Sequence, residues 1–424
     1  MSTIRSIPRR AGPRLLAVLA PLLQTRQHPG QSVANMQSTQ SSHAQAPTGD
    51  VMLGRGVDQV LPHHCPPHLY EECIADAREY TLLAIRQNGP LPPNRGYDYP
   101  WGYALQQMAL KTPDVRLINL ETAATLSGDA WRDKGIHYRM HPRNAEALRA
   151  AGVDVASLAN NHVLDWGFEG LHETLKSVRA AGVLPVGAGA DQAEAEAPAV
   201  VEVPGKGRVI VLAVGHWSSG VPGQWAAGPR RAGVATIKLD KGGVGKLAEQ
   251  VQRVKLPGDV VVLSIHWGGN WGFEVPAEQA AFAHHVIDEA GVDVVHGHSS
   301  HHPKGLEVYK GKLILYGCGD FISDYEGINS ETYQEAGFRD DISLGYYAEI
   351  DCSTGKLTRL QMVPARICHL SLAKPRTADI EWACETMNRE CWLLTGLAVK
   401  YVDGRANELE LQLQSQAGPA KPGV

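Results

Sequence analysis

The sequence predicts an α/β protein built on a mixed sheet or on two sheets packed face to face. Apolar runs typical of buried strands alternate with helix-like segments from Thr48 onward. The helix-like segments Gly243–Val254 and Pro276–Ala290 separate runs that would then lie parallel. The later runs Gly345–Asp351 and Leu357–Val363 follow one another with no helix between them, so we expect an antiparallel pair.

The remaining elements follow from the same reasoning in chain order. Buried strands are predicted by β-branched or leucine-rich runs bounded by turn signals, at Val115–Leu120, Val153–Leu158, Leu184–Val186, Gly207–Val214, Val260–Ile265 and Val292–Val295. Helical periodicity predicts helices at Arg143–Ala151, Gly167–Ala181 and Asp379–Leu394. Lys310-Gly311-Lys312 predicts the turn of a hairpin formed by Leu306–Tyr309 and Leu313–Tyr316.

The chain divides into three predicted parts. Residues 1–47 are basic, and we interpret them as signal-like or disordered. Residues 48–375 would form the main domain, and residues 376–424 a helical extension with a polar tail. Two irregular regions lie within the main domain. The first is the proline-rich Leu61–Pro113, which has a helix near Glu71–Arg86 and which we expect to be an insertion over the rim of the site. The second is Trp217–Trp225, which is either a substrate-contacting loop or a surface loop with packed indoles.

The N-terminal part of the sequence is compatible with more than one cellular location of the protein. Its arginines precede the apolar run Leu15–Leu23, which is similar to an export signal but shorter than the ~20 residues that a helix needs to span a bilayer. The alternatives are a disordered tail or a translation start placed too early. Gln24–Pro47 is polar and reads as a flexible linker. The protein would be exported or membrane-associated if the segment is a signal, and cytoplasmic otherwise.

Composition limits the classes of partner and cofactor. The 424 residues are 43% hydrophobic and 20% charged, with a formal net charge of −5, which provides no general case for nucleic-acid binding. Residues 1–49 contain arginines but no acidic residue, so the rest of the chain is acidic. An acidic domain would repel a polyanionic substrate, and metal ions bound at the site would reverse that repulsion locally. The seven cysteines form no close CxxC pair, so we expect mostly reduced core residues rather than a zinc knuckle.

Potential metal ligands lie at or near the ends of five predicted strands. Carboxylates occur at Asp50 and Glu121, and the adjacent pair Asn161-His162 follows another strand. Imidazoles follow the last two strands, as His266, His298 and His301. Because ligands bind outside the carboxyl ends of strands in open α/β sheets, these side chains are expected to converge. Their oxygen and nitrogen atoms suit a divalent metal ion.

The chain resembles the CapA family of capsule or poly-γ-glutamate synthesis proteins, which are related to calcineurin-like metallophosphoesterases. The resemblance extends from Thr48 to about Ile367, and the matching motifs occur in family order. They are Gly49-Asp50-Val51-Met52-Leu53-Gly54-Arg55, Asn119-Leu120-Glu121-Thr122, Leu158-Ala159-Asn160-Asn161-His162 with Asp165 and Gly167, His266-Trp267-Gly268, Gly297-His298-Ser299-Ser300-His301 and Gly305-Leu306-Glu307-Val308-Tyr309-Lys310-Gly311-Lys312. The resemblance implies a four-layer α/β/β/α sandwich.

The resemblance also implies roles for the strand-end residues. One or two divalent ions (Mn, Fe, Zn or Mg) would be held by Asp50, Glu121, Asn161, His266, His298 and His301. His162 would stabilise developing charge or protonate the leaving group, with Asn160 as a structural residue. Asp165 either orients His162 or caps the following helix. His296 and His302 are competitors for the place of the late histidines.

The resemblance implies a metal-dependent hydrolase acting on a phosphoester or on an anionic polymer such as poly-γ-glutamate. The alternative is a non-catalytic accessory subunit in synthesis or export of such a polymer, with polymer-synthase membrane subunits as partners. Two departures bear on this choice. Met52 stands where calcineurin-like enzymes usually have a metal-binding histidine, and Asp320 stands where relatives more often have asparagine.

Overall fold

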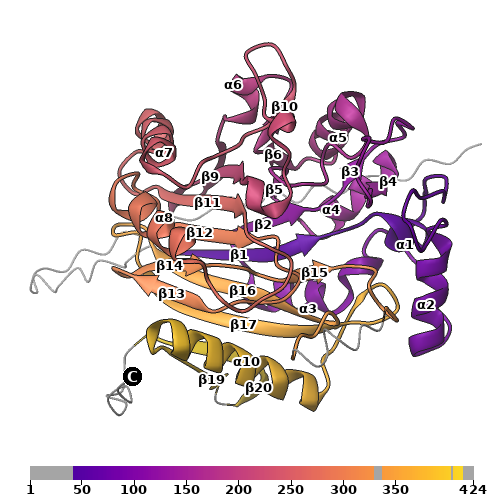
Figure 1. Ribbon diagram of the computed structural model, residues 1–424. Helices are drawn as coiled ribbons and strands as arrows, with labels where there is room; N and C mark the ends of the chain where they lie inside the picture. Colours follow the sequence, from indigo (N-terminus) through magenta and orange to yellow (C-terminus); the bar gives the residue numbers. More distant parts are fainter. Residues whose placement is uncertain (1–41, 329–336, 403, 414–424) are drawn as a thin grey trace, which may run out of the picture. The chain divides into compact units, whose positions relative to one another are not determined.

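Two large sheets carry the fold, and strand β1 (Ser42–Val51) lies inside the larger one (Figure 1). The computed structural model describes residues 42–328, 337–402 and 404–413. Within them the larger sheet has ten strands and runs in the order β19 (Ala398–Val402), β20 (Arg405–Gln412), β17 (Leu357–Ile367), β16 (Ile342–Asp351), β1, β2 (Val115–Leu120), β5 (Val155–Ser157) and β6 (Leu184–Val186). Two short strands join it at the side, β15 (Asp320–Ile322) on β1 and β18 (Leu372–Ala373) on β17.

The second sheet has six strands in the described residues. Its order is β13 (Leu306–Tyr309), β14 (Lys312–Leu315), β12 (Val294–His298), β11 (Val260–His266), β9 (Gly207–Gly215) and β8 (Ala199–Val203). Neighbours β9, β11, β12 and β14 are parallel, whereas β13–β14 and β8–β9 are antiparallel. Two small pairs complete the strands: β3 (Ala123–Ala124) with β4 (Arg139–Met140), and β7 (Ala188–Gly189) with β10 (Gly233–Val234).

The two-residue period of the strands divides the side chains of the second sheet between two cores. On β9, Val209 and Val211 belong to the large core that also holds β1, β2 and β5 side chains. Ile210 and Leu212 point the other way and pack with α7 (Lys241–Val254) and α8 (Ala277–Asp288). One face of this sheet therefore packs on the larger sheet and the other is covered by helices, as Figure 1 shows for α7 and α8.

The described residues contain seven further helices. They are α1 (Arg55–Asp58), α2 (Arg78–Asn88), α3 (Gly102–Lys111), α4 (Glu146–Ala150), α5 (Gly167–Ala180), α6 (Gln192–Ala195) and α10 (Thr377–Thr395). Single 3-10 turns occur at η1 (Tyr99–Trp101), η2 (Pro142–Ala145), η3 (Trp217–Ser219) and η4 (Gly223–Trp225). No helix among the described residues is long and apolar enough to span a membrane.

The predicted α/β class with mixed sheets is confirmed, including the 306–316 hairpin and the antiparallel pair β16–β17. Two element bounds differ from expectation. Strand β1 begins at Ser42, so the end of the predicted linker Gln24–Pro47 is part of the sheet. The helix expected near Glu71–Arg86 begins only at Arg78, since the chain before it is held by contacts such as the Leu69 N–H to Ala75 O hydrogen bond. Most of residues 1–47 lie outside the described residues.

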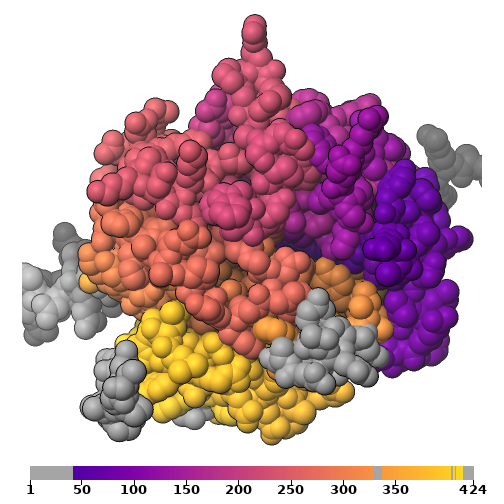
Figure 2. All heavy atoms as spheres, viewed as in Figure 1, coloured from indigo at the N-terminus to yellow at the C-terminus, as the bar shows by residue number. Residues whose placement is uncertain are grey.

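The C-terminal extension joins the larger sheet. Strand β20 pairs with β17, and α10 packs against β17 and β13. Figure 2 shows the yellow C-terminal segment continuous with the orange surface beside it. The extension also supplies Met387, Cys391 and Leu411 to the large core. It is therefore part of the main hydrophobic core.

None of the seven cysteines, all of which lie in the described residues, forms a disulfide bond. Six of them are buried, and Cys73 is exposed. This agrees with the expectation of mostly reduced core residues. Among them, Cys384 and Cys391 both lie on α10, where they form no disulfide.

Candidate metal centre

The carboxyl ends of parallel strands bring the predicted site residues together. Asp50 lies in the part of β1 that pairs in parallel with β2. In the second sheet, His266 of β11 lies opposite His298 of the parallel strand β12. The two sheets meet next to this edge, because His296 Nε2 on β12 lies 2.8 Å from the Thr48 carbonyl oxygen on β1. Residues far apart in sequence therefore share one buried site.

Asp50, His266 and His298 form the centre of this site. Each offers an oxygen or nitrogen atom, and these atoms all lie within 4.8 Å of one another. His266 Nδ1 is 2.7 Å from His298 Nδ1, which in turn is 4.0 Å from Asp50 Oδ1. Asp50 Oδ2 is buried with no hydrogen-bond partner among the described residues. A buried carboxylate oxygen without a partner is costly, so this donor set fits a divalent cation.

The electrostatics of the three side chains agree with that fit. Burial lowers the pKa of His266 and of His298 well below the usual value, so both imidazoles are neutral and have lone pairs available as ligands. Burial, followed by the nearby Asp320 carboxylate, raises the pKa of Asp50 to about 7. A positive ion would reverse this cost to the charged carboxylate. Ser264 Oγ lies 2.9 Å from His298 Nε2 and orients that ring.

Glu121 and Asn161 extend the site on the other side of His266. His266 Nε2 lies 3.5 Å from Glu121 Oε1 and 3.1 Å from Asn161 Oδ1. The Asn119 side-chain amide donates to Asp50 Oδ1 at 2.7 Å and also to Glu121. Burial and the charge of Asp50 raise the pKa of Glu121 well above its usual value. Asn119 therefore holds two carboxylates side by side.

His301 lies beside the centre and pairs with Asp320. Its Nδ1 is 3.0 Å from Asp320 Oδ1, and Asp320 lies in register with Asp50 in the β1–β15 pair. Burial alone would lower the pKa of His301, but the Asp320 carboxylate raises it above the usual value. The competitors have other partners: His296 contacts the Thr48 carbonyl, and His302 Nδ1 lies 3.0 Å from the Pro303 carbonyl oxygen.

His162 is held by Asp165 on the Glu121 side of the site. His162 Nδ1 lies 2.7 Å from Asp165 Oδ2, while Nε2 lies 4.0 Å from Glu121 Oε1. Asp165 makes no cap on the following helix, since Trp166 is the N-cap of α5 and no side chain caps it. Of the two roles expected for Asp165, the geometry supports the orienting one.

A lysine completes this arrangement. Lys134 forms an ion pair with Asp165, lies 3.1 Å from His162 Nδ1 and donates to the Asn161 carbonyl at 2.5 Å. Burial and the Lys134 charge lower the pKa of His162 to about 4, so the ring is neutral near pH 7. Tyr138 stacks on the same ring with a centroid distance of 3.9 Å.

A model of a known protein family matches most of this chain. The model of the family described as "Bacterial capsule synthesis protein PGA_cap" matches residues 46–325, which include all six predicted metal ligands and the His162–Asp165 pair. The chain belongs to this family.

Relatives of this PGA_cap member carry related names. A probable polyglutamine synthesis accessory protein of Mycobacterium tuberculosis is 46% identical over 343 residues, covering 80% of this chain and 89% of the relative. The capsule biosynthesis protein CapA of Bacillus anthracis is 31% identical over 196 residues, or 45% of each chain. The PGA biosynthesis protein CapA of Bacillus subtilis is 27% identical over 192 residues, covering 45% of this chain and 48% of the relative.

Three residues of the PGA_cap site had no assigned role in our sequence prediction. Lys134 and Tyr138 lie in a stretch without periodicity, so nothing in the sequence marks them. Arg55 belongs to the first motif, and the structure shows it buried: it pairs with Asp324 and Glu71 and lies over the rings of Tyr80 and Tyr138, among others. With these partners, Arg55 holds the wall of the site together rather than offering free donors to a ligand.

The residue at the unusual first-motif position also has a defined contact. The Met52 sulfur accepts a hydrogen bond from the Gly54 N–H at 3.2 Å, and Met52 is buried. Sulfur of this kind is a poor ligand for a hard divalent ion. The position therefore contributes to the β1–α1 turn.

Proposed function

We propose that this PGA_cap protein is a metal-dependent hydrolase that acts on a phosphoester or on an anionic polymer such as poly-γ-glutamate. The observation that carries the proposal is the buried group of Asp50, His266 and His298 beside the oriented His162–Asp165 pair, together with an Asp50 oxygen that has no hydrogen-bond partner in the described part of the chain. Glu121, Asn161 and His301 would complete the ligand set. We also propose that the two sheets and their helices form the four-layer α/β/β/α sandwich of calcineurin-like enzymes.

The residues of the chain have distinct tasks in this proposal. A divalent ion held by the ligand set would supply Lewis-acid polarisation of the scissile group. Asp165 holds the proton of His162 on Nδ1, which leaves Nε2 facing the site as the proton acceptor. Since the pKa of His162 is lowered to about 4, a proton taken at Nε2 is readily passed on to a leaving group. Lys134 keeps Asp165 ionised, because it lowers the pKa of that carboxyl against the opposing effect of burial.

The second proposal is a non-catalytic accessory subunit in synthesis or export of an anionic polymer, with synthase membrane subunits as partners. Two observations favour it. The Mycobacterium tuberculosis relative is named an accessory protein. Met52, whose sulfur is occupied by the Gly54 N–H, leaves one fewer ligand than calcineurin-like enzymes usually have.

Metal analysis combined with turnover distinguishes these proposals. Purified protein with added manganese is tested on phosphomonoester, phosphodiester and γ-glutamyl model substrates. We expect His162→Ala to lower kcat about 100-fold or more while metal content is unchanged, because the proposed proton acceptor is lost and the metal ligands remain. His298→Ala should lose metal. The matched control is His285→Ala on α8, whose side chain is half-exposed and pairs with Glu289.

The outcomes separate the two proposals. Full activity in His162→Ala would remove the proposed role of that ring. If metal-loaded protein binds one poly-γ-glutamate molecule per protein molecule and turns over none of the substrates, the accessory subunit would be favoured.

A further inference from the structure

Two tyrosine hydroxyls meet beside the candidate metal centre, and neither has a role in the hydrolysis proposed above. The hydroxyl oxygen of Tyr138 lies 2.6 Å from that of Tyr325, and either could donate to the other. Tyr138 directly precedes β4, whereas Tyr325 lies three residues after the end of β15. The fold therefore brings together two hydroxyls from segments that are far apart in the sequence.

The hydroxyl pair links the two sides of the site. The Tyr138 ring stacks on the His162 ring, with centroids 3.9 Å apart and an angle of 20° between the planes. The Tyr325 ring meets the His301 ring edge-on, with centroids 5.3 Å apart. His162 is the proposed proton acceptor, and His301 is a proposed metal ligand. A substrate held at the metal next to His162 would therefore lie close to the two hydroxyls.

Neighbouring groups hold both tyrosines in place. The backbone N–H of Tyr138 donates to Asp165 Oδ2 at 2.7 Å. The guanidinium carbon of Arg55 lies over both rings, 4.6 Å from the centroid of Tyr138 and 5.6 Å from that of Tyr325. Because the His162 ring covers one face of Tyr138, Arg55 covers the other face. The hydroxyls therefore have fixed positions before any ligand binds.

The hydroxyl pair has one proton more than it uses. Each phenol is protonated near pH 7, because the usual pKa of tyrosine is about 10. Two hydroxyls that face each other share one hydrogen bond, in which one donates and the other accepts. Within the described part of the chain, no further hydrogen bond joins either oxygen to another residue. The proton of the accepting hydroxyl is therefore available to a ligand.

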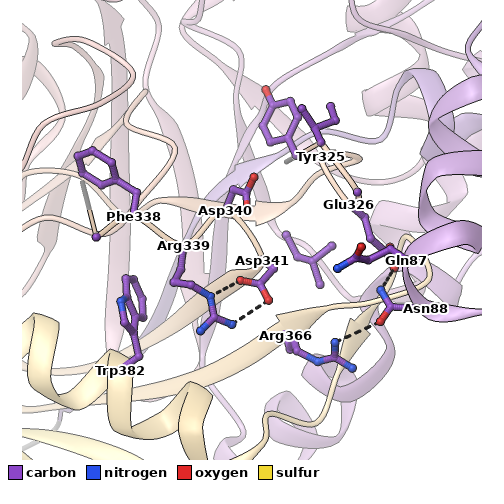
Figure 3. A pocket seen from close by; sticks show the side chains of 14 residues that line it. Gln87, Asn88, Tyr325, Glu326, Phe338, Arg339, Asp340, Asp341, Arg366 and Trp382 are labelled. Atoms are coloured by element: carbon purple, nitrogen blue, oxygen red, sulfur yellow. Dashed lines mark hydrogen bonds and ion pairs between the residues drawn. The ribbon is translucent and has the colours of Figure 1, made fainter. Parts of the chain in front are cut away.

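Exposure indicates which hydroxyl has the available proton. Tyr138 is 3% exposed, whereas Tyr325 is only half-buried, so a ligand reaches Tyr325 more easily. In the view of Figure 3, the Tyr325 hydroxyl points away from the Arg339–Asp341 ion pair, so these charges do not engage it. Tyr138 would then donate to the Tyr325 oxygen. Hydrogen bonds in such a chain strengthen one another.

We propose that the Tyr325 hydroxyl donates a hydrogen bond to an anionic oxygen of the substrate, and that Tyr138 is the residue that positions this hydroxyl. The anionic oxygen would belong to a phosphoryl group or to a carboxylate of the polymer. A fixed neutral donor of this kind stabilises an oxyanion without any rearrangement of the site. The inference rests on the proposed function, since it assigns a further substrate contact at the same site.

Calorimetric titration of the full-length protein, with manganese added, tests the inference. Inorganic phosphate and γ-glutamylglutamate are the two probes, and they distinguish a phosphoryl oxygen from a carboxylate. We expect Tyr325→Phe to weaken the affinity for at least one probe about tenfold, because a charge-assisted hydrogen bond is lost while the ring remains. Tyr138→Phe should weaken the same affinity about twofold, because Tyr325 loses its cooperative donor. Metal content should be unchanged in both variants.

The double variant separates positioning from substrate contact. If Tyr138 acts through Tyr325, adding Tyr138→Phe to Tyr325→Phe should weaken the affinity no further, whereas a general structural effect would add. Tyr309→Phe is the matched control, because Tyr309 lies on β13 and its hydroxyl donates to Asp288 at 2.9 Å. Its replacement should leave the affinity for both probes unchanged.

Three results would overturn the inference: no binding of either probe to the wild-type protein, unchanged affinity for both probes in Tyr325→Phe, or additive losses in the double variant. If Tyr325→Phe fails to fold, unchanged affinity in Tyr138→Phe would contradict the hydroxyl pair instead. The two proposals fail separately. Anion binding that depends on Tyr325 without any hydrolysis would remove the proposed enzyme and keep the contact, whereas hydrolysis with unchanged anion affinity in Tyr325→Phe would do the reverse.

Discussion

The orientation of one imidazole depends on two neighbours at the site. Asp165 fixes Nδ1 of His162 at 2.7 Å, and Lys134 balances the charge of that carboxylate. Replacing Asp165 by asparagine would present an amide of the same shape but without charge. The preferred proton position on the ring would then no longer be fixed.

We expect Asp165→Asn to lower kcat about 10- to 100-fold with metal content unchanged, because such orienting partners typically contribute that much. Steady-state kinetics with metal analysis measures both quantities. Asp240→Asn is the control, since Asp240 caps α7 through the Gly243 N–H. Equal loss in both variants would indicate a general effect on stability rather than orientation of His162.

Sequence reasoning at the residue scale was successful where a side chain follows a strand. Asp50 opens the apolar run Val51–Leu53, whereas His266 and His298 come after apolar runs, and the structure brings atoms of all three within 4.8 Å of one another. Their roles as ligands stay a prediction. Lys134 could not be found in this way, because it reaches the site from an irregular stretch with no period to place it. The contact of Asp320 with His301 also depends on how β15 pairs with β1.

At the scale of elements, the start of α10 is held by a carboxylate shared between arginines. Asp379 accepts from the Arg376 side chain and backbone and from Arg339. Burial alone would raise the pKa of Asp379, but these hydrogen bonds lower it to about 2. A lowered pKa means that the ionised carboxylate stabilises the folded protein at any pH above its unfolded value of about 3.9.

We therefore expect the difference in unfolding free energy between the wild type and Asp379→Asn to be constant above about pH 5. It should shrink as pH falls from about 4 toward 2, where the wild-type carboxyl becomes protonated. Urea unfolding at a series of pH values measures this difference. A difference that stays the same across that range would contradict the role of the charge.

Strand β1 shows what local sequence cannot predict. Its first residues, Ser42–Pro47, are polar and read as a linker, yet they form the strand between β2 and β16. Hydrogen-bonded pairing with a strand on each side overrides the weak preference of these residues for a strand conformation. The residue before β15 explains Gly49, because an added Cβ there would lie 1.6 Å from the Gly319 carbonyl oxygen.

At the scale of the whole molecule, the C-terminal extension and the main domain depend on one core. Met387, Cys391, Leu409 and Leu411 of the extension are each 0–2% exposed and belong to the large core. At about 1.5–3 kcal/mol for each buried side chain, these four stabilise the fold by roughly 6–12 kcal/mol. The net stability of a typical domain is only about 5–15 kcal/mol.

We expect a chain that ends at residue 375 to lose cooperative unfolding and to aggregate, because β17 would lose its partner β20 and become an edge. Circular dichroism and size-exclusion chromatography test this. A soluble truncated protein with the melting temperature of the full chain would show that the main domain folds without the extension, which would contradict the shared core.

The uneven exposure of the thiols has a practical consequence. Reactivity toward alkylating reagents follows accessibility, and Cys73 is exposed whereas the other six cysteines are buried. A maleimide dye should therefore attach at one position on the native molecule, and mass spectrometry after denaturation should reveal six further modifications. The chain thus contains a natural site for a fluorescent reporter, close to α2, without any engineered mutation.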